Sequence, residues 1–171
     1  AGPLVEITAV LGGILLADAG LAADEQDGAS RIAGTLSGGQ AAERFGRMIA
    51  AVGGPLGFAD NWQRFLPEAT VIREVTAKQT GYVTAIDGES LGLAVVRLGG
   101  GRMVESDRVN PSVGLAGVVR LGQKIENGRP LAVIHATRED DANVAESSLH
   151  AAITISPEAK PVPDLIHERI S

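Results

Sequence analysis

Apolar side chains recur every three or four positions through the first third of the chain, and this spacing places them on one face of a helix. The pattern predicts helices over residues 4–17 and 42–52. Between them, a shorter helix is expected to begin at Asp24 or Asp27, either of which can cap it, and to end near residue 36. The first third of the chain is therefore predicted to be helical.

Residues 57–66 are expected to add one or two helical turns, with Trp62 and Phe65 facing inward. After Pro67 the pattern changes to short β-branched or aromatic runs separated by turn residues, which is typical of strands. Strands are expected at residues 71–75, 82–86, 117–119, 123–125, 131–137 and 153–155, and helices at 91–98 and from Asp140 or Asp141 to Leu149. We therefore predict an α+β fold with a helical segment at residues 1–66 and an α+β domain at residues 67–171.

Composition narrows the class of protein. The 171 residues have a net charge of −6 without acidic or basic blocks, which argues against a nucleic-acid partner. The lack of cysteine excludes disulfides and thiolate metal sites and fits a reducing cytoplasm. No apolar run reaches the ~20 residues that span a bilayer, and residues 10–16 lack the basic flank of a signal peptide. Because the chain starts abruptly in helix-like sequence, we expect it to begin within a longer protein.

Two glycine motifs suggest phosphate chemistry at first sight. Residues 36–40, Leu-Ser-Gly-Gly-Gln, spell the signature motif of ABC-transporter ATPases. That chemistry also needs a Walker A loop and an apolar strand ending in an aspartate–glutamate pair, and the sequence has neither, so we interpret the motif as a hinge between helices. Residues 99–102, Gly-Gly-Gly-Arg, follow a predicted helix C-terminus, where the macrodipole disfavours anions. We interpret them as a helix stop and a flexible loop.

The titratable residues form no recognisable catalytic or metal-binding pattern. The histidines are His135, His150 and His167. None is spaced from another as metal ligands on a helix are. His135 alternates with Leu131 and Val133 on one predicted strand face, which favours a structural role, and His150 lies at a predicted helix end, where a cation is stabilised. Residues 139–141, Glu-Asp-Asp, are interpreted as a solvated helix start. We therefore predict no catalytic, cofactor-binding or metal-binding residue.

Residues 117–131 resemble the latter half of biotinyl and lipoyl carrier domains, in which a short turn and a Pro-Leu strand precede the hairpin that presents the modified lysine. Here that hairpin is expected at residues 136–139, with no lysine at its tip. A barrel-sandwich-like backbone is thus expected without swinging-arm chemistry. A stand-alone interaction module of this fold is the alternative function, and a covalent adduct on Lys78 or Lys124 would favour it.

Five further blocks carry a more specific resemblance. They are residues 41–48, 80–83, 91–102, 107–114 and 130–136. In this order and spacing they resemble the C-terminal part of the thymidine phosphorylases, within the pyrimidine-nucleoside phosphorylase family. The resemblance implies a homodimeric, cytoplasmic pentosyltransferase that cleaves thymidine or deoxyuridine with phosphate, giving the free base and 2-deoxyribose 1-phosphate. It also implies that residues 1–66 end the central α/β domain and that residues 67–171 form the C-terminal domain.

The same resemblance implies which chemistry lies elsewhere. The family's phosphate loop, and the arginine, serine and lysine that hold the pyrimidine, have no matching position in these residues, so none is carried over. Phosphate, thymidine and the dimer contact are expected to involve residues that this sequence does not contain. We expect no cofactor, metal, nucleic-acid or membrane partner. The chain alone is expected to be inactive, with a structural role in supporting the cleft and moving with the phosphate-binding lobe.

Overall fold

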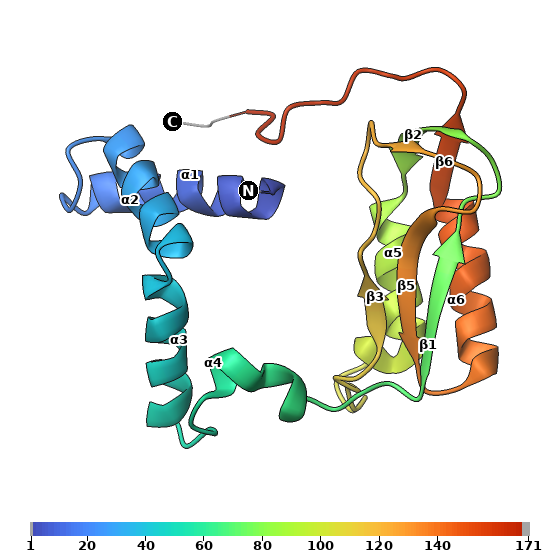
Figure 1. Cartoon of the computed structure of the whole chain (residues 1–171), viewed down its shortest axis with the longest axis horizontal. Coiled ribbons are helices and arrows are strands. Elements are labelled where there is room, and N and C mark those ends of the chain that lie inside the picture. The colour runs from blue at the N-terminus through green and yellow to red at the C-terminus, as the bar shows by residue number, and fades with distance from the viewer. Residues whose placement is uncertain (1, 169–171) are drawn as a thin grey trace. The chain divides into compact units, whose positions relative to one another are not determined.

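The computed structural model describes residues 2–168 of the chain (Figure 1). Two compact units are present: Ala1–Phe65 with Pro163–Ser171, and Leu66–Val162. A helical region followed by sheets confirms the predicted α+β class, and the sheets of the described residues do not close into a barrel.

The first unit is built from helices. They are α1 (Pro3–Asp18), α2 (Glu25–Ser37), α3 (Gln40–Ala51), α4 (Phe58–Asn61) and the 3-10 turn η1 (Trp62–Arg64). Asp24 caps α2 by accepting a hydrogen bond of 2.8 Å from the backbone N–H of Asp27. The predicted helices are thus confirmed, and of the two candidate aspartates Asp24 is the cap.

Two glycines let α1 and α2 approach closely. A Cβ atom on Gly13 would lie 2.5 Å from the backbone nitrogen of Ala29, and one on Gly28 would lie 2.5 Å from the carbonyl oxygen of Gly13. The expectation that Trp62 and Phe65 face inward is wrong, because these side chains are 49% and 44% exposed. The ring of Phe65 instead stacks on that of Phe58, with the centroids 5.9 Å apart.

The second unit contains two antiparallel three-stranded sheets and two main helices. Its elements are β1 (Val71–Thr76), β2 (Gly81–Ile86), α5 (Gly88–Val95), the π-helix η2 (Val96–Gly100), β3 (Gly114–Ala116), β4 (Lys124–Ile125), β5 (Pro130–Ala136), α6 (Glu139–Ala152) and β6 (Ile153–Ser156). The strand orders are β1-β5-β3 and β4-β2-β6. Figure 1 shows β1, β5 and β3 side by side, with α5 and α6 on one face of their sheet.

The core of this unit joins both sheets to α6. Its largest fully buried side chains come from four elements: Val75 of β1, Val83 of β2, Leu131 and Ile134 of β5, and Leu149 of α6. Along β5 the buried and half-buried residues alternate from Val133 to Ala136, as the period of a strand requires. The core therefore fixes how α6 lies on the first sheet.

Two predicted elements of this unit are wrong. The strand expected at residues 117–119 lies three residues earlier, at β3, because Gly117 has a φ of +61° and ends the extended run. The hairpin expected at residues 136–139 is a junction between strand and helix. β5 ends at Ala136, Arg138 is the N-cap residue, and three acidic residues in the first turn of α6 favour a helix start.

Candidate functional site

The triple glycine ends η2, the π-helix that continues α5, in the way the sequence indicates. Gly99 has a φ of +94°, which side chains rarely adopt. A Cβ atom on Gly100 would lie 2.9 Å from the Val95 side chain, and one on Gly101 would lie 2.6 Å from the Val96 side chain. Backbone conformation and close packing therefore account for all three glycines, which confirms the helix stop.

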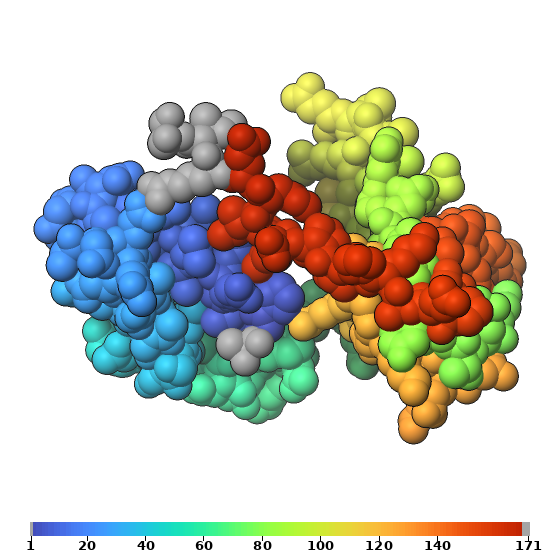
Figure 2. Space-filling view, turned by 90° about the horizontal axis from the view of Figure 1, so that it is seen from above, coloured from blue at the N-terminus to red at the C-terminus, as the bar shows by residue number. Residues whose placement is uncertain are grey.

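The loop after the glycines is held by the side chains of Asp107 and Asn110. Asp107 Oδ2 accepts hydrogen bonds from the backbone N–H groups of Met103 and Val104, at 2.9 and 3.1 Å. These two residues are 72% and 58% exposed, and the yellow atoms of the loop project from the second unit in Figure 2. The loop also presents the exposed guanidinium groups of Arg102 and Arg108 to solvent.

Asn110 joins the far end of this loop to the rest of the domain. Its backbone N–H donates to the Gly99 carbonyl oxygen at 2.8 Å, and its side-chain Nδ2 donates to Thr137 Oγ1 at 3.2 Å. Its Oδ1 accepts from the backbone N–H and hydroxyl of Ser112, at 3.0 and 2.8 Å. The sequence predicts only a loop at Asn110 and Pro111, although the Asn-Pro dipeptide is a turn signal.

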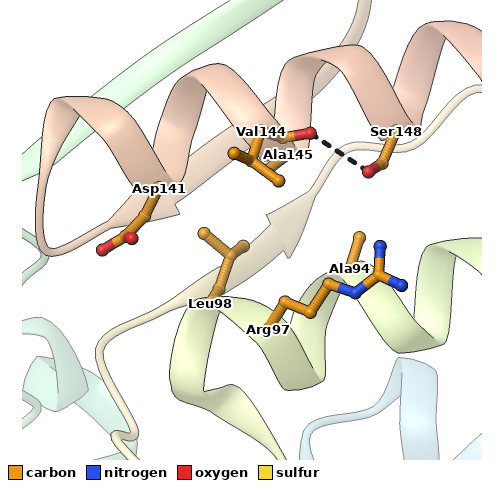
Figure 3. A pocket seen from close by; sticks show the side chains of 7 residues that line it. All are labelled: Ala94, Arg97, Leu98, Asp141, Val144, Ala145 and Ser148. Carbon is orange, nitrogen blue, oxygen red and sulfur yellow. Dashed lines mark hydrogen bonds between the residues drawn. The ribbon is translucent and has the colours of Figure 1, made fainter.

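A pocket of about 70 Å³ lies between α5 and α6 (Figure 3). It is lined by Ala94, Arg97, Leu98, Asp141, Val144, Ala145 and Ser148. A shallower hollow of about 320 Å³ shares Arg97 and Ser148 and is also lined by Asp87. The Ser148 hydroxyl donates to the Val144 carbonyl at 3.0 Å, and Asp87 accepts from the Ser90 hydroxyl and N–H, which lowers its pKa. Most polar lining groups are thus bound to their own helix.

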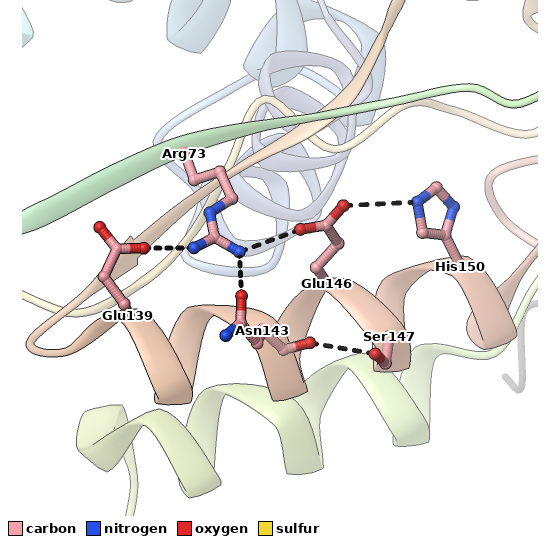
Figure 4. Close-up of polar contacts among 6 residues, drawn as sticks. All are labelled: Arg73, Glu139, Asn143, Glu146, Ser147 and His150. Atoms are coloured by element: carbon pink, nitrogen blue, oxygen red, sulfur yellow. Dashed lines mark hydrogen bonds and ion pairs between the residues drawn. The ribbon is translucent and has the colours of Figure 1, made fainter.

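A second cluster ties β1 to α6 through one arginine (Figure 4). Arg73 Nη1 donates to Asn143 Oδ1 at 2.7 Å and to Glu146 Oε2 at 3.0 Å, and Nη2 pairs with Glu139. The two carboxylates, Glu139 first, raise the pKa of Arg73. We call Arg73, Glu139, Asn143 and Glu146 the Arg73 clamp. Its geometry suits the fixing of a helix on a sheet, and Arg73 remains charged throughout the physiological range.

His150 lies one turn beyond the clamp on α6. Its Nε2 is 4.0 Å from Glu146 Oε1, and its side chain is 18% exposed. Burial lowers its pKa, and the nearby Lys78 lowers it further, whereas Glu146 acts in the opposite sense. The pKa shift runs opposite to the expectation that a helix end favours a charged His150, because burial penalises the charged imidazole.

The other sequence motifs lie apart from these features. Residues 36–40 join α2 to α3 with Gly39 at a φ of +82°, which confirms the hinge. His135 lies on β5 opposite Ile72, and His167 lies in the C-terminal segment outside any helix or strand. Among residues 2–168, no three histidine or acidic side chains gather as a metal site would require. No helix described by the structure is both long and apolar enough to cross a bilayer.

Comparison with protein families matches one part of the chain. Residues 82–156 match the family model of the pyrimidine nucleoside phosphorylase C-terminal domain. The match supports a C-terminal portion of a pyrimidine nucleoside phosphorylase. The match runs from β2 through β6, so the matched region includes the glycine loop, the α5–α6 pocket and His150. It covers less than half of the chain, and the helices of the first unit lie outside it.

Proposed function

We propose that this chain is the C-terminal part of a thymidine phosphorylase. Such an enzyme cleaves thymidine with phosphate and gives thymine and 2-deoxyribose 1-phosphate. The observation that carries the proposal is the match of residues 82–156 to the C-terminal domain of the pyrimidine nucleoside phosphorylases. The five sequence blocks support the narrower choice of thymidine, and three of them, at residues 91–102, 107–114 and 130–136, fall wholly within the match.

We further propose that the chain is inactive alone and acts as a structural support. Phosphorolysis needs a cradle for phosphate and a group that stabilises the departing base. The family resemblance assigns both to residues outside this sequence. Within the second unit, the glycines have packing roles, and the Arg73 clamp uses its carboxylates to hold a helix. The proposal includes a cytoplasmic homodimer whose contact lies in the helical domain of the intact enzyme.

The test compares the chain with the complete gene product that contains it. Thymine release from thymidine and phosphate is followed by absorbance, with deoxyuridine and uridine as competing substrates. We expect turnover of thymidine and deoxyuridine by the complete protein and none by the purified chain. Turnover by the chain, retained after removal of host phosphorylase, would contradict its proposed inactivity. A complete protein that prefers uridine would contradict the thymidine assignment.

The alternative function, a carrier-like interaction module, lacks its expected hairpin, because the junction between β5 and α6 takes the place of that hairpin.

A further inference from the structure

Asn127 and Gly128 form an exposed turn between β4 and β5. Asparagine followed by glycine is the dipeptide most prone to deamidation, because glycine has no side chain to hinder attack by its own backbone nitrogen. In that reaction, the Gly128 nitrogen forms a bond with Cγ of Asn127, the Cγ–Nδ2 bond breaks, and ammonia leaves with the proton lost from Gly128. Water then opens the cyclic imide to aspartate or isoaspartate.

The turn has a conformation that opposes this ring closure. The Arg129 N–H donates to the Glu126 carbonyl at 3.0 Å, and Gly128 has a φ of +80°. No non-glycine residue in the described part of the chain has a positive φ, so Asn127 is in the negative range. This combination defines a type II turn, in which ψ of Asn127 is about 120°. Ring closure must rotate that bond.

The β1–β2 turn also occupies the attacking nitrogen. The Gly128 N–H donates to the Ala77 carbonyl at 2.8 Å, and the Ala77 N–H donates to the Arg129 carbonyl at 2.8 Å. The Asn127 N–H donates to Thr80 Oγ1 at 3.0 Å. Residues 77–80 therefore bind three consecutive residues of the turn, and the nitrogen that must lose its proton is already a hydrogen-bond donor.

We propose that Asn127 is a latent deamidation site whose reactivity is controlled by the β1–β2 turn. The folded domain protects it, and reaction proceeds from the state in which residues 77–80 have released the turn. Once formed, isoaspartate adds a backbone carbon between residues 127 and 128, so the paired hydrogen bonds with Ala77 cannot all re-form. The modification therefore records opening of this end of the domain and makes it irreversible.

The chain supplies its own internal references. The other asparagines are Asn61, Asn110 and Asn143, which precede Trp62, Pro111 and Val144. Bulky residues hinder the attack, and proline has no N–H to supply the nucleophile. Deamidation of the unfolded chain is thus expected at Asn127 first.

The experiment follows the mass of the peptide that contains Asn127 during incubation at mildly alkaline pH, in buffer and in concentrated urea. We expect reaction of the folded chain to be slower by about tenfold or more, because the rate scales with the population of the open state. Thr80→Val removes the hydroxyl acceptor at similar size and should raise the folded-state rate several-fold. Thr84→Val is the matched control, because the hydroxyl of Thr84 is hydrogen-bonded to Ser156 on the neighbouring strand instead of to the turn. Equal rates in the folded and unfolded chain, or equal rates in the two variants, would overturn the proposal.

Discussion

The two units differ in where their large apolar side chains lie. In the second unit, Ile134 and Leu149 are fully buried, and their neighbours come from both sheets and α6. In the first unit, Leu4 is 78% exposed, Leu15 is 70% exposed, and the described buried residues are small ones such as Ala9 and Gly13. Both units have regular helices, so helical pattern alone does not make a core. The second unit contains its own core, whereas the first unit leaves many of its large apolar side chains exposed.

The largest expected effect comes from separating the units. Residues 66–162 expressed alone should unfold in one cooperative thermal transition, because their core is complete within that range. Residues 1–65 alone should lose helicity gradually, since isolated helices of this length are marginal in water. Far-UV circular dichroism during heating checks both outcomes. A cooperative transition of monomeric residues 1–65 would contradict the comparison.

A pair of leucine substitutions in the intact chain tests the same difference in packing between the two units. Leu149→Ala should lower the free energy of unfolding of the second unit by roughly 2–5 kcal/mol, because it leaves a cavity in a packed core. Leu15→Ala, at a 70% exposed position of α1, should change the free energy of unfolding of the first unit by less than about 0.5 kcal/mol. Urea unfolding measures both values. Equal effects would mean that Leu15 is as well packed as Leu149.

The sequence pattern was sufficient for the helices and most strands, because periodicity reports which face of an element is apolar. It was insufficient where the conformation of a single residue determines where a strand ends. The adjacent valines Val118 and Val119 look like strand residues, but Gly117 ends β3 just before them. Val119 then makes one ladder-like bond, from its N–H to the Leu131 carbonyl at 2.9 Å, without extending the strand.

The candidate site was harder to predict because it depends on contacts between distant residues. Arg73 and Glu146 meet across the boundary between β1 and α6, and no local spacing indicates that pair. Asn110 and Thr137 are likewise brought together by the fold of the loop. The junction at residues 136–139 is a different case, because the acidic first turn of α6 was visible in the sequence and favours a helix start.

A smaller effect is expected from the Arg73 clamp, which fixes α6 on the first sheet. Arg73→Met keeps the aliphatic stem but removes the donors to Asn143 and Glu146, so the melting temperature of the domain should fall by a few degrees. The matched control is Arg129→Met. Its ion pair with Glu126 spans 3.9 Å between largely exposed side chains and should contribute little. Differential scanning calorimetry of both variants checks this, and equal melting temperatures would contradict a special role for the clamp.

The smallest effect is a pH dependence of the free energy of unfolding that His150 of the second unit causes. Burial and Lys78 lower the pKa of His150 in the folded state below its ordinary 6.5, so the unfolded chain binds a proton first as the pH falls. The free energy of unfolding should therefore decrease from about pH 7 to about pH 5. His150→Gln should flatten this part of the profile. The lowered pKa values of Asp87 and Asp141 act in a separate window, below their ordinary 3.8. His167→Gln, in the exposed C-terminal segment, should leave the profile unchanged, and an unchanged slope in His150→Gln would show that another group causes it.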